Sequence, residues 1–531
     1  MQFDVIVVGG GSAGCAIAAR LSEDSSLNVL LLEAGTSDKH GVTKIPAMMT
    51  AAMQNPEFDW RFRAEPDPSL RDRVDIWPAG KCLGGGGAIN GMAYIRGLPS
   101  DYDRWAKEGA TGWDYASVLP VLKRIEHNER GADNYRGGEG PLRVSEGRDH
   151  SHLVEEWIEA VVDSGAFRSP DLNGAHNEGV DFVQVTQKNG VRQSAAVYLE
   201  SALKRKNLQL IANAQATRIR FEGRRAVGVD YMLHGQPYAI DAARGVVVCG
   251  GAINSPKLLL QSGLGPAAHL REMGVDVVAD LPGVGENLQD HPGAQIVHDV
   301  NVPTLNTDAR GLGALKQALT FGLSRKGLLA ASLGHAHAFL RTRDGLDAPN
   351  VHLIFSAYAL DFDKDGALTM RKQPSISTFA HVCHPRARGH VRLRSPDPMD
   401  APVIQHSVLG DDDDMEMLVE AMECARFIAG RAPLSARISG EVRPGWASSN
   451  KEGLRDFLRQ YATASYDVAG TCKMGADAMA VVDHTLKVRG IEGLWVADAS
   501  VMPSLVAGGA NATAIMIGEK GAELVKAALA A

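Results

Sequence analysis

The N-terminal stretch DVIVVGGGSAGCAIAARL constrains the fold more than any other part of the chain. The apolar, β-branched run Phe3–Val8 is too short for a helix and stops at three consecutive glycines, which is typical of a buried parallel strand. Residues 12–21 then have helical spacing, and a second apolar run at 28–32 ends at Glu33. The stretch therefore predicts a strand, a glycine turn, a helix and a second strand, as in a βαβ unit.

Gly9, Gly11 and Gly14 have the spacing of a dinucleotide-binding turn. In such a turn the first glycine allows the sharp bend, the second lets the backbone approach a pyrophosphate, and the third allows close packing of helix on strand. Glu33 lies nineteen residues after Gly14 and can accept hydrogen bonds from a ribose hydroxyl. An acid in this position disfavours a 2′-phosphate, so the pattern favours FAD or NAD over NADP.

Two later runs, at 245–249 and 494–497, also resemble buried strands, and they end at Gly250-Gly251 and at Asp498. Ligands of parallel sheets lie across the carboxyl ends of the strands, so these distant segments are expected to build one nucleotide-binding domain. Alternating stretches at 335–340 and 389–394 predict antiparallel strands of a second domain. The run of acids at 411–414 is interpreted as a solvated loop or a helix N-terminus.

Composition narrows the class of function. A chain of 531 residues is long enough for two domains, and a net charge of -8 gives no case for nucleic-acid binding. The six cysteines are scattered without a C-x-x-C pair, so the sequence indicates neither a zinc site nor a disulfide framework. The absence of a disulfide framework favours a reducing compartment. The N-terminus lacks the basic segment of a secretory signal, and no apolar run reaches the length of about 18 residues that a membrane span needs. We expect a cytoplasmic protein that acts on small molecules.

A second glycine cluster, GKCLGGGGAINGM at 80–92, contains four consecutive glycines. Each glycine costs conformational entropy on folding, so the cluster is either a loose surface loop or backbone that must lie flat against a planar ligand. Because apolar residues flank it, we favour the second interpretation.

These residues resemble the glucose-methanol-choline (GMC) oxidoreductases, flavoproteins that oxidise alcohols. The resemblance rests on GKCLGGGGAIN, GAINSPKLLLQSGLG, PGVGENLQDHP, TCKMG, and the C-terminal VADASVMP and NATAIMIGEK, which follow the family's order along the whole chain. In style the chain is similar to bacterial choline-dehydrogenase-like and sorbose-dehydrogenase-like members.

The resemblance implies an α/β protein, α+β overall, with a Rossmann-like FAD-binding domain built from residues 1–150, 205–300 and 470–531. Residues 151–204 and 301–469 would form a substrate-binding domain with an antiparallel sheet and helices. Some members attach FAD through a histidine in the first glycine loop; that position is Ile89 here, so FAD is expected to bind without a covalent link. The expected FAD contacts are Gly9, Gly11, Ser12, Ala13, Gly14, Glu33, Ala34, Gly80, Leu83, Gly84, Gly86, Gly87, Asn90, Gly91, Met92, Ala93, Ala216, Gly251, Asp498, Ala499, Asn511, Ala512 and Thr513.

The expected catalytic pair departs from the family. Alcohol oxidation needs a hydride acceptor and a base for the hydroxyl proton. The family commonly places a histidine before G-T-C and a second histidine or asparagine near the C-terminus. Asn511 matches the second position, but the first is Asp467, in SYDVAGTC.

An ordinary Asp titrates near pH ~3.9 and His near ~6.5, so as a base Asp467 forfeits about 3.5 kcal/mol of driving force unless burial raises its pKa. An ionised Asp would also repel negative charge on a reduced flavin. Asp467 is therefore a base with a raised pKa, an acid that orients a polyol or cationic alcohol, a mark of altered or low activity, or only a backbone partner.

Other histidines could supply a base. His335 and His337 sit two apart, so both face one side of a strand, and His381 and His384 fall on a segment that lines the substrate cavity in the family. H-x-H alone is weak evidence for a metal, and none is expected. His291, in QDHP, is interpreted as structural.

The sequence predicts an FAD-dependent alcohol dehydrogenase or oxidase. Its substrate would be a primary alcohol, polyol or amino alcohol, and its electron acceptor oxygen or another compound. A lyase or another non-redox or low-activity use of the same fold is the alternative. The specific alcohol, the oligomeric state and peripheral membrane association stay open.

Overall fold

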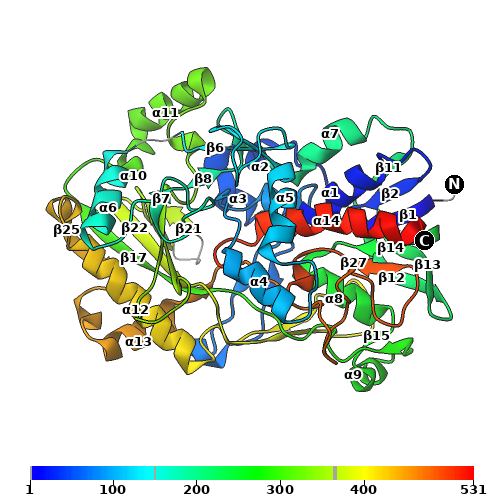
Figure 1. The fold of residues 1–531 in the computed structure, drawn as a ribbon. Helices are drawn as coiled ribbons and strands as arrows, with labels where there is room; N and C mark the ends of the chain where they lie inside the picture. Colours follow the sequence, from blue (N-terminus) through cyan, green and yellow to red (C-terminus); the bar gives the residue numbers. More distant parts are fainter. Residues whose placement is uncertain (1–2, 149–150, 363–367, 531) are drawn as a thin grey trace.

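A computed structural model describes residues 3–148, 151–362 and 368–530. Two sheets lie at opposite ends of the molecule, with helices packed on and between them, and both chain ends lie beside the first sheet, at the right of Figure 1. The division into a sheet of mixed direction and an antiparallel sheet confirms the predicted fold class.

The first sheet has the order β11-β2-β1-β14-β13-β12, with β27 also pairing with β14. Its parallel part contains the strands that stop at the sequence motifs, and β12 and β13 extend it as an antiparallel meander. The strands come from three separated parts of the chain, as predicted. They are β1 (Phe3–Val8), β2 (Val29–Leu32), β11 (Leu208–Ile211), β12 (Ala214–Glu222), β13 (Arg225–Leu233), β14 (Gln236–Val248) and β27 (Leu494–Val496).

Two helices from opposite ends of the chain pack together beside this sheet (Figure 1). α1 (Ser12–Leu21) has the predicted bounds, and α14 (Asn511–Ala530) runs alongside it. A Cβ at Gly518 of α14 would lie 2.5 Å from the carbonyl oxygen of Ala13, so only glycine permits this approach. The approach brings the start of α14 to the first glycine turn.

The second sheet is antiparallel, with the order β25-β17-β22-β19-β18-β7 and β26 on β17. Helix α12 (Asp412–Ala429) packs on β17, β19 and β22, and α6 (His152–Asp163) and α13 (Lys451–Tyr461) pack against α12. The strands are β7 (Gly179–Phe182), β17 (Pro292–Val300), β18 (Ala336–Leu340), β19 (Val351–Ser356), β22 (Ser375–Val382), β25 (Ile438–Arg443) and β26 (Thr463–Ala464).

Helices α4 (Pro99–Lys107), α5 (Tyr115–Ile125) and α8 (Gly251–Gln261) are the other long elements near the first sheet. The shorter helices and strands are α2 (Gly41–Lys44), α3 (Met49–Ala52), α7 (Leu199–Ala202), α9 (Ala267–Glu272), α10 (Leu305–Asp308), β3 (Phe62–Arg63), β4 (Ile76–Trp77), β5 (Glu126–Asn128), β6 (Leu142–Glu146), β8 (Gln184–Val185), β9 (Gln187–Lys188), β10 (Val191–Arg192), β15 (Leu264–Gly265), β16 (Ala279–Asp280), β20 (Leu360–Phe362), β21 (Leu368–Met370), β23 (His390–Arg392) and β24 (Val403–Gln405).

Three details differ from the sequence-based expectations. β17 lies within the 205–300 segment that was assigned to the FAD-binding domain, yet it pairs with β22 and β25 of the second sheet. β23, predicted as a strand of the second domain, pairs with β24 in a separate two-stranded ribbon. Within the acidic run, Asp411 caps α12 as expected. Asp414 is buried instead of solvated, and its carboxylate is satisfied there by hydrogen bonds from the backbone N–H groups of Arg386 and Ala387.

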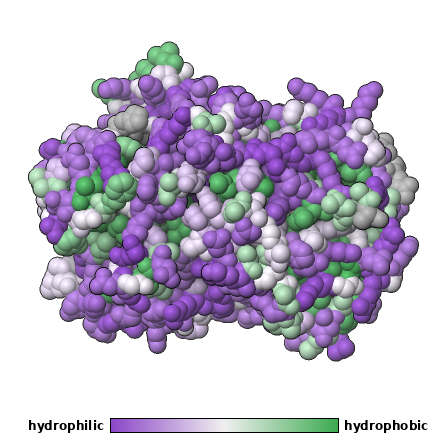
Figure 2. Space-filling view, in the orientation of Figure 1, coloured by the Kyte–Doolittle hydropathy of each residue, from purple (hydrophilic) through white to green (hydrophobic). Residues whose placement is uncertain are grey.

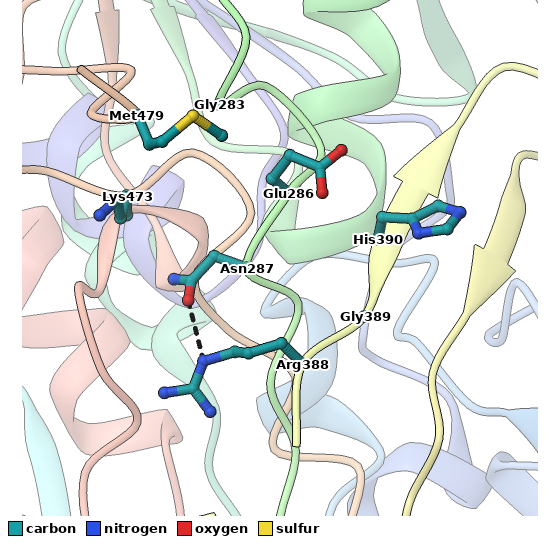
Figure 3. A pocket seen from close by; sticks show the side chains of 8 residues that line it. All are labelled: Gly283, Glu286, Asn287, Arg388, Gly389, His390, Lys473 and Met479. Carbon is teal, nitrogen blue, oxygen red and sulfur yellow. Dashed lines mark hydrogen bonds between the residues drawn. The ribbon is translucent and has the colours of Figure 1, made fainter. Parts of the chain in front are cut away.

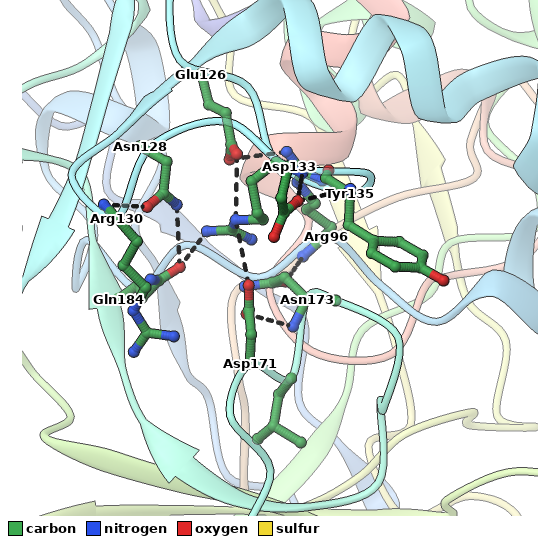
Figure 4. Close-up of polar contacts among 12 residues, drawn as sticks. Arg96, Glu126, Asn128, Arg130, Asp133, Tyr135, Asp171, Asn173 and Gln184 are labelled. Atoms are coloured by element: carbon green, nitrogen blue, oxygen red, sulfur yellow. Dashed lines mark hydrogen bonds and ion pairs between the residues drawn. The ribbon is translucent and has the colours of Figure 1, made fainter.

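A buried ionic cluster fixes the segment after α5 (Figure 4). The Glu126 carboxylate lies 2.8 Å from the guanidinium of Arg96 and 3.2 Å from that of Arg136, and all three side chains are buried. Arg136 also reaches Asp171, in the loop before β7, at 3.4 Å. The cluster therefore ties two distant stretches of chain together.

Glu126→Gln is expected to destabilise the protein by about 3 kcal/mol, because it leaves the buried guanidinium of Arg96 without its counter-charge and Arg136 with the more distant carboxylate of Asp171. The loss should appear as a lower melting temperature of the flavin-loaded protein. Glu139→Gln, at an exposed position in the same region, is the matched control and should change stability by less than about 0.5 kcal/mol. Equal melting temperatures for the two variants would contradict a stabilising role for the cluster.

Candidate active site

In the first glycine turn, Gly9 and Gly14 are closely packed against neighbouring backbone, whereas Gly11 is not. Gly9 has a φ of +102°, and a Cβ there would lie 2.4 Å from the carbonyl oxygen of Cys249. A Cβ at Gly14 would lie 1.8 Å from the carbonyl oxygen of Gly9, whereas one at Gly11 would meet its nearest neighbour, Gly85, only at 3.8 Å. The bend and the packing are therefore built into the chain, and the surface at Gly11 stays open to a ligand.

Glu33, at the end of β2, supports this turn. Its two carboxylate oxygens accept hydrogen bonds from the backbone N–H groups of Gly10 and Gly35, both at 2.7 Å. Burial raises the pKa of Glu33 more than these hydrogen bonds lower it. Each carboxylate oxygen can accept a further hydrogen bond, so a ribose hydroxyl remains a chemically suitable partner.

The second glycine cluster is clamped between the first turn and the start of α14. A Cβ at Gly84 would meet the Ser194 side chain at 2.2 Å, and one at Gly85 would meet Gly11 at 2.7 Å. A Cβ at Gly86 would meet nothing within 4 Å, and this glycine is exposed while those beside it are buried. The loop thus presents its backbone to open space at Gly86, as a surface for a flat ligand requires.

Three of the expected cofactor residues meet at the start of α14. The Ser12 hydroxyl donates to the side-chain oxygen of Asn511 at 2.6 Å, and a Cβ at Gly87 would lie 3.2 Å from that same oxygen. Asp498, after β27, accepts hydrogen bonds from the backbone of Gly251 and from the hydroxyl of Ser255. The structure therefore gathers the first turn, the glycine cluster, α8 and α14 at the carboxyl ends of parallel strands.

The other expected contacts lie on the same segments. Ala13 is in α1 and Ala34 follows Glu33; Ala216 is in β12, Ala499 follows Asp498, and Ala512 and Thr513 are in the first turn of α14. Gly80, Leu83, Asn90, Gly91, Met92 and Ala93 flank the glycine cluster. An open cradle beside a helix N-terminus fits a nucleotide with a pyrophosphate and a planar ring.

Asp467 is bound to the backbone of the residue that precedes Asn511. Its Oδ1 accepts a hydrogen bond from the backbone N–H of Ala510 at 2.9 Å, one residue before α14 begins. Its own N–H donates to the buried Asp290, and its side chain is 24% exposed. Asp467 is thus held at the N-terminal end of a long helix with part of its side chain still exposed.

His291 lies behind Asp467 with its side chain fully buried. Its Nε2 is 3.1 Å from the Val506 carbonyl oxygen, and because a carbonyl only accepts, Nε2 carries a proton. Its Nδ1 faces Oδ2 of Asp467 at 3.5 Å. A neutral ring would direct a lone pair at that carboxylate, so the contact is favourable only with a proton between the two groups.

The charges of this cluster agree with the geometry. Burial alone lowers the pKa of His291, but the carboxylate of Asp467 beside it raises the pKa above the ordinary histidine value. Burial, together with the charge of Asp467, raises the pKa of Asp290 to about 7. The sequence interpretation treated His291 as structural and missed Asp290; the only sequence signal for either was their place in QDHP.

Three further histidines, His337, His352 and His381, form a buried row across the second sheet. His337 Nδ1 lies 3.1 Å from His352 Nε2, and His352 Nδ1 lies 2.5 Å from His381 Nε2. The ring of His381 packs edge-on against His291 at 4.9 Å. Burial lowers the pKa of His337 to about 3 and holds those of His352 and His381 well below the ordinary value, so these rings are neutral at physiological pH.

The histidines that the sequence interpretation considered as a base or a substrate contact all have partners within the protein. His335 accepts a hydrogen bond from the backbone of Ala357, and His384 pairs with Asp101 at 2.6 Å. His337 and His381 are engaged with His352, which the sequence interpretation did not single out. Among the described residues, no group of three His, Cys, Asp or Glu side chains could hold a metal ion.

A surface pocket of about 380 Å³ lies elsewhere (Figure 3). It is lined by two of the family-like segments, through Gly283, Glu286 and Asn287 from one and Lys473 from the other, and by Arg388, Gly389, His390 and Met479. Arg388 donates to Asn287 at 3.0 Å. Neither Asp467 nor Asn511 lines it, so these motifs also serve to build a surface away from the candidate site.

None of the helices in the described ranges is both long enough and apolar enough to span a bilayer.

A Rossmann-like sheet with a clamped glycine loop at the carboxyl ends of its parallel strands is the framework of a nucleotide-binding protein. The GMC oxidoreductase family models match residues 3–293 with their N-terminal part and 385–518 with their C-terminal part. The chain belongs to the GMC oxidoreductase family, and it is an FAD-dependent alcohol oxidoreductase.

Relatives of known name cover nearly the whole chain. An oxygen-dependent choline dehydrogenase of Brucella melitensis is 39% identical over 526 residues, which is 98% of this chain and 95% of the relative. That of Rhizobium etli is 39% identical over 531 residues, with the same coverage. Among solved structures, pyridoxine 4-oxidase from Mesorbium loti has a TM-score of 0.89 at 28% identity and covers 98% of this chain and 99% of its own. Formate oxidase has a TM-score of 0.92 at 22% identity, which shows the fold alone; it covers 99% of this chain and 98% of its own.

Gly86→Ala tests where the cofactor lies. The protein itself has room for the added methyl group, so the variant should fold and melt like the parent in the absence of flavin. If the flavin ring lies against this loop, the methyl group will lower the amount of FAD that purifies with the protein at least several-fold. Flavin absorbance per protein is the measurement. Full FAD content would contradict the placement.

Proposed function

We propose that this protein oxidises a primary alcohol, a polyol or an amino alcohol to the aldehyde or ketone, with Asp467 as the base and Asn511 as its partner. The observation that carries the proposal is the hydrogen bond from Ala510 to Asp467, which holds the acid next to Asn511. Asn511 is in turn held by Ser12 of the first glycine turn. The acid, the amide and the cofactor loops are therefore neighbours.

We assign the cofactor to residues 1–150, 205–300 and 470–531, apart from β17, and the substrate to 151–204 and 301–469. When bound, FAD supplies the hydride acceptor, and with Ile89 in the loop we expect it to be bound without a covalent link. Gly11 and Gly86 offer open backbone to it, and Glu33 can accept from its ribose.

Asp467 is suited to receive the hydroxyl proton. One oxygen is fixed by Ala510, and the other is left facing His291 at 3.5 Å. A substrate hydroxyl that donates to this carboxylate would pass its proton to a group already held in place, which removes the cost of orienting it. The side-chain amide of Asn511 can donate a hydrogen bond to the same alcohol oxygen.

His291 offsets the electrostatic disadvantage of an acid at this position. A carboxylate alone would oppose any negative charge that develops during hydride transfer. With His291 protonated behind it, the pair of Asp467 and His291 is neutral overall. The positive charge that other members place on a histidine at the position of Asp467 would here lie on His291, which is buried behind that position. We propose that one proton shared by Asp467 and His291 replaces the usual histidine.

An amino alcohol is the favoured substrate class. The curated relatives are named for choline, and a cationic substrate would meet the partly exposed carboxylate of Asp467 before His291, which is buried behind it. In anaerobic mixing with a panel of amino alcohols, polyols and aromatic alcohols, an amino alcohol should bleach the flavin absorbance fastest. If no alcohol bleaches the flavin but one is cleaved or dehydrated, the protein is a lyase and this proposal is wrong.

Asp467→Asn is expected to lower the rate of anaerobic flavin reduction by at least 10²-fold while FAD content is unchanged, because an amide cannot accept the proton. Asp467→His should keep measurable turnover and should lose it as pH falls through about 6.5, where an ordinary histidine becomes protonated and can no longer act as a base. Asp477→Asn, at an exposed carboxylate in the same region of the sequence, is the control. Near-full reduction rates in Asp467→Asn would exclude Asp467 as the base.

A further inference from the structure

Helix α11 (Gly311–Ser324) turns an apolar face to solvent. Four of its leucines are largely exposed: Leu312 by 86%, Leu315 by 59%, Leu319 by 58% and Leu323 by 88%. Their spacing places them on one side of the helix. In Figure 1 the helix projects from the body at the top left, and in Figure 2 it forms a hydrophobic prominence there.

The opposite side of α11 attaches it to the protein largely through polar groups. Gln317 accepts from the backbone of Leu328 at 2.9 Å and donates to Asp308 at 3.2 Å. Phe321 is the buried residue of the helix, and Arg325 lies over its ring at 4.9 Å. The helix is thus inverted relative to an ordinary surface helix, whose leucines face the core.

The charge around this face is positive. Arg310, Lys316, Arg325 and Lys326 are its charged residues, and no Asp or Glu occurs from residue 309 to 343, although the whole chain carries a net charge of -8. Lys316 follows Leu312 by four residues and so lies on the leucine side. An apolar stripe with basic residues beside and beyond it complements a surface of acyl chains and anionic headgroups.

The same charges argue against a second copy of this chain as the occupant. A two-fold contact through α11 would bring each Lys316 and its basic neighbours against those of the other copy. Such a contact would set like charges together, since Asp308, the acid that is hydrogen-bonded to α11, lies with Gln317 on the opposite side of the helix. We propose that α11 is a membrane-surface helix that inserts Leu312, Leu315, Leu319 and Leu323 into an anionic phospholipid surface.

The test is co-sedimentation of the flavin-loaded protein with vesicles of phosphatidylcholine alone or with 30% phosphatidylglycerol, a composition chosen so that headgroup charge is the only variable. Binding to the anionic vesicles is expected, with at least ten-fold weaker binding to neutral ones and a loss of binding at high salt. Equal binding to both, or to neither, overturns the proposal.

Variants separate the leucines from the charges. Leu315→Glu with Leu319→Glu should abolish vesicle binding, and Lys316→Gln with Lys326→Gln should weaken it at least three-fold. Leu203→Glu changes an exposed leucine after α7 and should bind like the parent. Unchanged FAD content and turnover in solution show that each variant is folded. Retained binding in the double leucine variant, or a leucine-dependent dimer in sedimentation velocity without lipid, overturns the proposal.

Discussion

The contact between the two glycine-rich turns is the constraint on which the candidate site depends. The backbone N–H of Gly84 donates to the carbonyl oxygen of Gly10 at 2.7 Å, and a Cβ at Gly85 would lie 2.7 Å from the Cα of Gly11. A side chain at Gly85 would therefore push the loop away from the first turn. Because Asn511 is attached to the same turn through Ser12, the position of Asp467 also follows from this backbone contact.

The sequence predicted the parts of the fold that local pattern determines. Strand Phe3–Val8 and helix Ser12–Leu21 have the predicted bounds because an apolar run, a glycine turn and helical spacing each act within a few residues. The sheet to which β17 belongs could not be predicted from such local patterns. The sequence of β17, PGAQIVHDV, has no regular alternation that would mark one face, and only its pairing with β22 and β25 assigns it to the second sheet.

The same limit applies to the site. Asp467 and Asn511 could be singled out by their motifs, but the cluster around them depends on register between strands far apart in sequence. His352 and His381 stand opposite each other in the pairing of β19 with β22, and His381 stands opposite Gly293, two residues after His291. No spacing within a single segment encodes that row. The inverted face of α11 is similar, since leucine spacing predicts a helix and an apolar side but not the direction that side faces.

The exchange of histidine for Asp467 therefore need not change the total charge of the site. A carboxylate alone would add a negative charge beside the cofactor loops, and at a short distance in a partly buried site such a charge is costly. His291 is near enough to share its proton, and its Nε2 is already committed to the Val506 carbonyl, so a second proton must go to Nδ1. In the proposed site the pair would differ from a lone imidazolium in geometry: the group nearest the substrate would accept a proton, and the positive charge would stay fixed behind it. That division of roles would allow a weak base to work without an opposing field, because the positive charge of His291 balances the carboxylate before the proton is transferred.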